Sequence, residues 1–252
     1  MNQTDYSLLS KMNIQSDAII VNQCNRNETT EFNYNHHHIL WISLKERGVG
    51  LSRNTALLRS SADIVLFADE DVVYSDEYEQ TIIQAFESHP KISLIAFNLS
   101  SLNEKRPEYL VKKDHKLTLL NCLKYGACRI AVKRESVFYR TITFSLLFGG
   151  GSLYSAGEDN LFVVQCLRHG LKGMASREFI GLVEQKSSTW FKGYTEKYYY
   201  DRGILMYLMY GDFAYILLTI LNHRNRSNEL LSLYERQKAS MKGIQFARVL
   251  FR

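Results

Sequence analysis

The most constraining feature of this sequence is a mostly apolar run, residues 62–68, that ends directly in three acidic residues. The acidic residues are Asp69, Glu70 and Asp71. A short apolar run of this kind is typical of a central strand in a parallel sheet, which is buried on both faces. In open α/β sheets, ligands bind at the carboxyl ends of such strands. The sequence therefore predicts a ligand site at this acidic triplet.

The spacing of the acidic residues suits a divalent cation. Alternate side chains of an extended backbone point the same way, so Asp69 and Asp71 can face one ion while Glu70 points elsewhere. Mg²⁺ and Mn²⁺ are commonly held by one or two carboxylates together with water and the phosphates of a substrate. The alternative is that these acidic residues only cap the helix that follows them.

Strand and helix patterns alternate along the first part of the chain. We expect helices over residues 6–12, 51–58 and 77–88, strands over residues 18–21, 39–42, 62–68 and 92–98, and a loop over residues 22–35. Ser52 is the expected N-cap of the second of these helices. This alternation predicts an α/β fold with a mostly parallel central sheet flanked by helices.

The last quarter of the chain is aromatic and helical in pattern. Its most apolar stretch, residues 204–221, has Gly211 and Asp212 in the middle. A lone carboxylate at membrane depth is costly, so a packed or interfacial helix is favoured over a spanning one. We expect a main domain over residues 1–191 and a helical C-terminal extension over residues 192–252 that associates with a membrane surface or a partner.

Composition narrows the class of protein further. The net charge is +5 without a long basic run, which fits an enzyme that binds phosphorylated substrates, and no nucleic-acid-binding motif is present. The four cysteines form no CxxC pair, so a disulfide framework or zinc site is not expected. Met1 is followed by polar residues rather than by a signal peptide pattern. The expected location is the cytoplasm, including the inner face of the plasma membrane.

Two segments resemble glycosyltransferase family 2. The first is GVGLSRNTALLRSSADIVLFADED, residues 48–71, in which a glycine-rich turn leads to a helix, a strand and a D-x-D motif. The resemblance implies a GT-A fold and a nucleotide-sugar donor. It also implies that Arg53 lies near the nucleotide, usually uracil, that Asp69 contacts the nucleotide sugar, and that Asp71 binds the metal bridging the diphosphate. We expect Asp69 to share this metal, which would be Mn²⁺ or Mg²⁺.

The second segment is GEDNLFVVQCLRHGLK, residues 157–172, which resembles the acceptor motif of the same family. By this resemblance Asp159, with Glu158 beside it, is the general base that takes the proton of the acceptor hydroxyl. A hydroxyl is a poor nucleophile until its proton has an acceptor, so the assignment is chemically consistent. The family resemblance also implies inversion at the anomeric carbon. The alternative is that both acids only favour a helix N-terminus.

The N-terminal region departs from the family pattern. Members of the family normally begin with an apolar strand and a turn that touches the base. Here only the tail of that turn is matched, at Met1-Asn2-Gln3, and Asn2 is the expected donor contact within it. The next strand normally ends in acidic residues, which are replaced by Asn22 and Gln23. These three residues are the expected remaining donor contacts. Either the start of the sequence is truncated or the first strand is absent, and loss of a central strand would expose a sheet edge.

Further contacts are expected near residue 190. Trp190 could stack on a sugar, while Lys192 and Arg202 could meet phosphate or acceptor. Aromatic residues at helical spacing are more often packed in a core, so a purely structural role for these aromatic residues stays open. The apolar and basic C-terminal region favours a membrane-proximal, lipid-linked glycan acceptor, as in bacterial surface or capsular polysaccharide synthesis.

Two other functions remain open at this point. A nucleotidyltransferase uses a similar fold and similar metal carboxylates, but would not need the base at Asp159. A degenerate glycosyltransferase-like binding protein would keep the fold without turnover, as the absent strand allows. We expect a glycosyltransferase that moves a sugar from a nucleoside diphosphate, UDP in the first instance, to a hydroxyl of a glycan.

Overall fold

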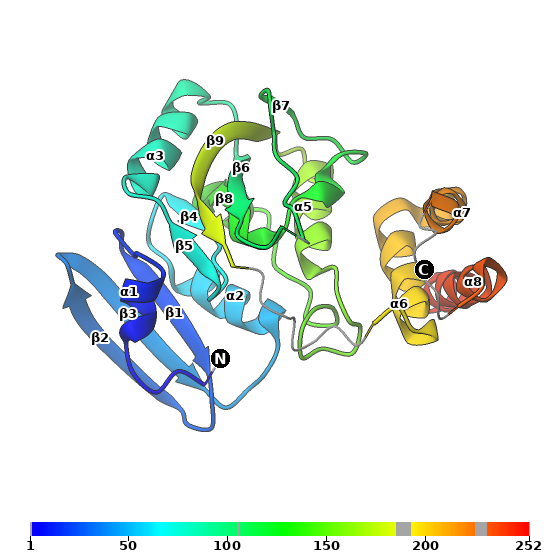
Figure 1. Cartoon of the computed structure of the whole chain (residues 1–252), viewed down its shortest axis with the longest axis horizontal. Coiled ribbons are helices and arrows are strands. Elements are labelled where there is room, and N and C mark those ends of the chain that lie inside the picture. The colour runs from blue at the N-terminus through cyan, green and yellow to red at the C-terminus, as the bar shows by residue number, and fades with distance from the viewer. Residues whose placement is uncertain (1, 105, 185–192, 225–230, 252) are drawn as a thin grey trace.

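The computed structural model describes residues 2–104, 106–184, 193–224 and 231–251. Two β-sheets and their helices form an α/β domain, and three helices form a separate layer at the C-terminal end (Figure 1). The predicted boundary at residues 191 and 192 lies outside the described residues.

The first sheet has three strands in the order β1-β3-β2, with bounds β1 Ala18–Gln23, β2 Glu28–Tyr34 and β3 His37–Leu44. The loop expected over residues 22–35 is wrong, because half of it, Glu28–Tyr34, forms the antiparallel edge strand β2. Thr30, Phe32 and Tyr34 are less exposed than the polar residues between them. This two-residue alternation is the strand signal that the polarity of the segment concealed.

The second sheet has the strand order β4-β8-β6-β9-β5, with β7 paired to β9. Its strands are β4 Ile64–Leu66, β5 Val72–Tyr74, β6 Leu94–Ser101, β7 His115–Lys116, β8 Ile130–Lys133 and β9 Gly173–Val183.

The α/β class with flanking helices is confirmed, but the expectation of a mostly parallel sheet is wrong. Among the strands that the structure describes, only β1–β3 and β6–β9 pair in parallel. The apolar run at residues 62–68 forms the short strand β4, which lies at the end of its sheet and is antiparallel to β8. An apolar run reports burial on two faces, and burial alone fixes neither strand direction nor position in the sheet.

The helices of the α/β domain are α1 Ser7–Lys11, α2 Val49–Arg59, α3 Tyr78–Ser88, α4 Arg134–Phe138 and α5 Glu158–Arg168. The predicted N-cap of α2 at Ser52 is wrong. Gly48, with φ of 131°, is the N-cap, and its carbonyl accepts the first helical hydrogen bond from the Ser52 amide. A residue with a side chain is strained at this φ, so the glycine determines where the helix begins.

The C-terminal helices are α6 Glu196–Tyr210, α7 Ala214–Arg224 and α8 Leu233–Leu250. Helices α6 and α8 cross closely, since a Cβ on Gly203 would lie 2.2 Å from the carbonyl oxygen of Ser240. Ile204 of α6 and Ile244 of α8 belong to the same buried core as Phe162 of α5, which anchors this layer to the domain.

One described helical segment, Glu196–Arg224, is long and apolar enough to cross a membrane by length and composition, and 28% of its most apolar window is buried. It is interrupted by a 3₁₀ turn at Gly211–Phe213. Asp212 in this turn forms an ion pair of 2.5 Å with Arg248 of α8. The acidic residue expected to disfavour spanning is therefore exposed and paired outside the core.

Candidate active site

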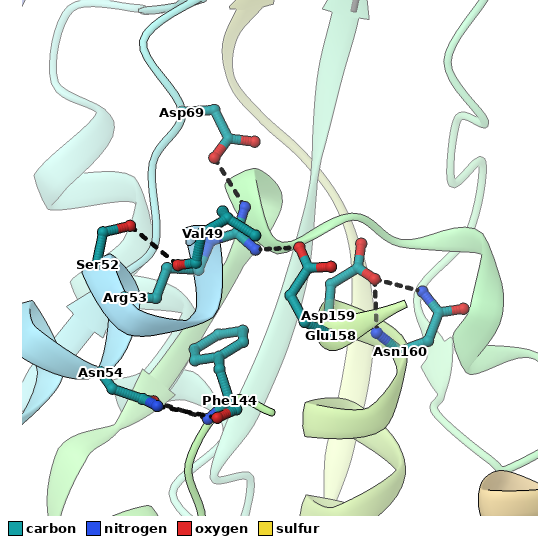
Figure 2. A network of polar contacts seen from close by, with 9 residues as sticks. All are labelled: Val49, Ser52, Arg53, Asn54, Asp69, Phe144, Glu158, Asp159 and Asn160. Carbon is teal, nitrogen blue, oxygen red and sulfur yellow. Dashed lines mark hydrogen bonds and ion pairs between the residues drawn. The ribbon is translucent and has the colours of Figure 1, made fainter. Parts of the chain in front are cut away.

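A buried arginine joins the two acidic motifs that the sequence singled out. Arg53 of α2 donates from Nη2 to Asp69 Oδ1 at 2.8 Å and from Nη1 to Glu158 Oε1 at 2.6 Å (Figure 2). Its side chain is 9% exposed, and that of Glu158 is 11% exposed. The acidic motifs after β4 and at the start of α5 are thus tied to one cation, although 89 residues separate Asp69 from Glu158.

Close packing holds α2 in the position that this contact requires. A Cβ on Gly50 would lie 2.2 Å from the carbonyl oxygen of Ser145, so only glycine fits there. Asn54 binds both backbone groups of Phe144, donating to its carbonyl at 2.9 Å and accepting from its amide at 2.8 Å. The Phe144 ring also lies under the Arg53 guanidinium, 5.4 Å from the ring centroid. The helix that carries Arg53 is therefore fastened to the segment that precedes the second acidic motif.

The second acidic motif begins α5, and its two members have different surroundings. Glu158 is buried and engaged with Arg53. Asp159 is half-buried, and its Oδ1 accepts from the backbone amide and the side-chain amide of Asn160 at 2.7 and 2.8 Å (Figure 2). In the described part of the chain, no hydrogen bond is made to Asp159 Oδ2. The geometry therefore leaves Asp159, rather than Glu158, with an oxygen available to a substrate.

Gly149 packs against Glu158 and Val49, and the sequence analysis did not identify it as part of the site. Its φ is 103°, and a Cβ there would lie 2.6 Å from Glu158 Oε2 and 2.5 Å from Val49 Cγ1. The available signal was the Gly149-Gly150-Gly151 run, which precedes the acidic pair closely in sequence. A residue without a side chain is needed where backbone approaches a carboxylate this closely.

The electrostatics of the cluster follow from burial and charge. Burial lowers the pKa of Arg53, but the carboxylates of Asp69, Glu158 and Asp159 outweigh this effect and hold the pKa above its ordinary value. Burial, and then the adjacent Asp159 carboxylate, raise the pKa of Glu158 against the opposing effect of Arg53. A permanently charged guanidinium among three carboxylates leaves the cluster with excess negative charge.

Asp71 lies on the same loop as Asp69 and is half-buried. Burial, followed by the charges of Asp69, Glu70 and Glu184, raises its pKa above the ordinary value of an aspartate. No group of three or more His, Cys, Asp or Glu side chains in the described ranges is arranged to hold a metal ion alone. Two crowded carboxylates nonetheless fit Mg²⁺ or Mn²⁺ that is completed by water and a diphosphate.

The three residues expected to contact the donor lie together at the carboxyl end of β1. The Asn2 amide donates to the Gln23 carbonyl at 3.0 Å. Asn22 exchanges two hydrogen bonds of 2.9 Å with the backbone of Gln3, and the Gln23 side chain donates to the Gly48 carbonyl at 2.9 Å. Asn22 and Gln23 are buried, so in this structure their side chains hold the backbone together.

Gln3 belongs to the matched tail of the turn, but the sequence assigned it no contact. Its Nε2 donates to Glu70 Oε2 at 2.8 Å, which connects the N-terminal segment to the acidic triplet. No sequence signal distinguishes this glutamine, because the contact spans 67 residues.

The described structure does not place Trp190, Lys192 or Arg202, the residues expected to contact phosphate or acceptor, beside this cluster. Trp190 and Lys192 lie outside the described residues. Arg202 lies on α6 and is half-buried beside Tyr198. Its predicted contact with phosphate or acceptor stays a prediction.

Comparisons with known proteins identify the family and the fold. The family model described as glycosyl transferase family 2 matches residues 5–148, which is more than half of the chain. The chain therefore belongs to glycosyl transferase family 2. No curated protein matches the sequence significantly.

Solved structures show the same fold at low sequence identity. The crystal structure of S. aureus TarS 1-349 in complex with UDP-GlcNAc matches with a TM-score of 0.67 and 16% identity, over 96% of this chain and 75% of that one. A second crystal structure of S. aureus TarS 1-349 matches with a TM-score of 0.64 and 17% identity, over 95% of this chain and 74% of that one. The longer TarS structure matches with a TM-score of 0.60 and 16% identity, over 88% and 41%. The expected GT-A-like fold is thereby confirmed.

Proposed function

We propose that this glycosyltransferase moves a sugar from a UDP-sugar to a hydroxyl of a glycan acceptor, with inversion at the anomeric carbon. The observation that carries the proposal is Arg53 bound between Asp69 and Glu158, which brings both acidic motifs of the family to one place. The UDP-GlcNAc in the TarS complex supports the choice of donor class.

The donor would lie on the Asp69 and Asp71 side of the cluster. Asp69 Oδ1 is occupied by Arg53, and that contact fixes the carboxylate in one orientation for the sugar or ribose hydroxyls. A divalent ion bound by Asp71 and Asp69 would supply charge neutralisation for the diphosphate that departs. The crowding of Asp71 with other carboxylates supports a cation at this position.

The proton of the acceptor would pass to Asp159. The acceptor oxygen forms a bond to the anomeric carbon on one side while the bond from that carbon to the UDP oxygen breaks on the other. The acceptor proton goes to Asp159 Oδ2, and the electron pair leaves with UDP. Asn160 keeps Oδ1 fixed, so the carboxylate presents Oδ2 without rearrangement. In this account Glu158 is a positioning residue, because its contact is with Arg53.

The acceptor would be a lipid-linked glycan at the inner face of the plasma membrane, as in bacterial surface polysaccharide synthesis. Tyr215, Ile216 and Ile220 of α7 are about half exposed, and Val249 and Leu250 near the end of α8 are more exposed still. Apolar residues on helices that also carry lysine and arginine support interfacial binding to anionic lipid.

A second candidate is a sugar-nucleotide-binding protein without turnover. The observation that favours it is a large groove lined by Arg53 and Asp69, where the donor site is open on one side. Titration of the wild-type chain with UDP in the presence of Mn²⁺, followed by measurement of sugar transfer, separates the two functions.

The donor proposal is tested by calorimetric titration with UDP and UDP-GlcNAc, with and without Mn²⁺. We expect Mn²⁺-dependent binding that Asp71→Asn weakens by at least about tenfold, which corresponds to about 1.4 kcal/mol. Asp63→Asn is the matched control, because Asp63 is an exposed aspartate that precedes the same strand. Equal binding by Asp71→Asn and the wild type would show that the metal assignment is wrong, and absence of UDP binding by the wild type would remove the donor assignment.

A further inference from the structure

One face of Gly126 is open, and that face is turned toward Asp159. A Cβ built on Gly126 would lie 3.8 Å from Asp159 Oδ2, and among the described residues no other atom beyond its chain neighbours lies within 4 Å of it. Asp159 Oδ1 is held by Asn160, so Oδ2 is the oxygen left for a substrate. Open space therefore adjoins the oxygen that would take the proton of the acceptor.

Neither backbone conformation nor packing requires a glycine at position 126. Its φ is −72° and its ψ is 160°, which is extended backbone that residues with a side chain adopt readily. At Gly50, by contrast, a Cβ would lie 2.2 Å from a carbonyl oxygen, and at Gly149 it would lie 2.5 Å from Val49 Cγ1. Glycine is also used where the backbone lies close to a ligand. Close approach of a bound molecule is the reason that remains for Gly126.

Residues 126–128 run from the proposed base to the aspartate expected to contact the donor. β4 and β8 pair antiparallel, and the Phe67 amide continues this pairing by donating to the Ile130 carbonyl at 3.1 Å. Two residues further along, the same register sets Cys128 opposite Asp69. Burial, followed by the charge of Asp69, raises the pKa of the Cys128 thiol, which agrees with this placement. One end of the segment thus lies at Asp159 and the other at Asp69.

Buried side chains next to the segment fix its position. Arg129 is 1% exposed, and it donates to the carbonyl oxygens of Phe97 at 2.7 Å and Tyr109 at 3.0 Å. The buried Tyr125 ring lies against the same guanidinium, 5.3 Å from its centre. Displacement of a buried, hydrogen-bonded arginine leaves its partners unsatisfied, so the backbone of residues 126–128 resists movement. A side chain added at position 126 would therefore project into the open space.

The proposed reaction places one sugar ring along this segment. In a displacement with inversion, the acceptor oxygen, the anomeric carbon and the departing UDP oxygen lie in a row, so the transferred sugar lies between the base and the diphosphate. Asp159 marks the acceptor end of this row, and Asp69 with Asp71 marks the diphosphate end. The backbone between residues 126 and 128 spans at most about 7 Å, which is the scale of a single sugar ring.

We propose that Gly126 is a specificity-determining residue, whose bare backbone, together with Cys128, lines the site of the transferred sugar and sets the room available to it. This inference rests on the proposed function, from which it takes the donor and the base. The nucleotide and diphosphate lie toward Asp71, beyond the reach of a small side chain at position 126. A side chain there would thus exclude the sugar of the donor and leave the UDP part in place.

The test is calorimetric titration of the intact chain, in the presence of Mn²⁺, with UDP and with UDP-GlcNAc, UDP-glucose and UDP-galactose. The variants are Gly126→Ala and Gly126→Val. We expect the Kd of the most tightly bound UDP-sugar to rise by about tenfold or more in Gly126→Val, the range that one misfitting methylene produces in a pocket. The rise should be smaller in Gly126→Ala, and the Kd of UDP should change by less than about twofold in both.

Two controls separate loss of room from damage to the fold. UDP lacks the sugar, so a distorted variant would lose UDP and the UDP-sugar together. Ala62→Val adds the same two methyl groups to an exposed residue at the other end of β4 from Asp69, and should leave the binding of both ligands unchanged.

Each other outcome overturns the proposal in a distinct way. Equal weakening of UDP and the UDP-sugar by Gly126→Val would place the effect in the nucleotide site or the fold. Unchanged binding of both would assign the open space to the acceptor alone. Binding of UDP but of no UDP-sugar by the wild type would show that no sugar is held there. Absence of UDP binding by the wild type would remove the proposed donor and this inference with it, which distinguishes that failure from those in which UDP binds.

Discussion

The protein is packed much more closely on the α5 side of Arg53 than on the side of β1 and β4. On the side of α5, its guanidinium is buried against Glu158, and the backbone at Gly50 and Gly149 packs so closely that no methyl group fits. On the side of β1 and β4, apolar strand residues remain half-exposed along open edges. The difference teaches that the charged centre is held by α2, α5 and the loop before α5, and not by the half-exposed strands β1 and β4.

The largest loss of stability is expected on substitution of Arg53, which lies between the two sides. Arg53→Met removes the cation and leaves the buried Glu158 and the partly exposed Asp69 without their partner. Breaking a buried ion pair on one side typically costs about 3–5 kcal/mol, so we expect a loss near the lower value in urea unfolding. Arg59→Met on the exposed face of the same helix is the control and should cost little. Similar stability losses in both variants would contradict a central role for Arg53.

A smaller loss of stability is expected from disturbing the close packing on the α5 side of Arg53. Gly50→Ala would place a Cβ 2.2 Å from the Ser145 carbonyl oxygen, so α2 must shift. Overpacking of this kind costs about 1–3 kcal/mol, which thermal unfolding would measure. Gly126→Ala is the control, because its Cβ would be 3.8 Å from the nearest atom, Asp159 Oδ2. If Gly50→Ala were as stable as the wild type, the close contact between α2 and the Ser145 carbonyl would be contradicted.

The smallest effect is expected in the groove between β1 and β4. Ile20→Ala truncates a half-exposed side chain on β1 and should cost less than about 1 kcal/mol, since little buried surface is lost. Ile39→Ala on the paired strand β3 truncates a fully buried side chain and should cost about 2–5 kcal/mol. Urea unfolding of the two variants compares them directly, and equal losses would show that the groove is already filled.

Much of the chemical centre could be predicted from sequence because its motifs are local. The acidic triplet follows an apolar strand, and the second acidic pair begins a helix, so both were placed correctly at element ends. Resemblance to the family added Arg53, which the structure buries between Asp69 and Glu158, while its contact with the nucleotide stays a prediction. Its buried position depends on Phe144 and Gly50, which no local pattern links to it.

The arrangement of the sheet was less predictable because it depends on contacts distant in sequence. The apolar run that forms β4 predicts burial on two faces, but its position at a sheet end depends on β8, more than sixty residues later. The polar composition of β2 hid an edge strand whose only sign was alternation at Thr30, Phe32 and Tyr34. The described structure leaves one edge of β1 and one edge of β4 unpaired, because β1 pairs with β3 alone and β4 pairs with β8 alone.

The most direct test of the proposed mechanism is a comparison of turnover and binding for Asp159→Asn. The asparagine keeps the shape of the side chain and its contacts with Asn160, but cannot accept the proton of the acceptor. We expect the transfer rate from UDP-GlcNAc to fall by about 10²–10⁴-fold while the Kd for the donor changes little. Near-normal turnover by Asp159→Asn would contradict the assignment of Asp159 as the general base.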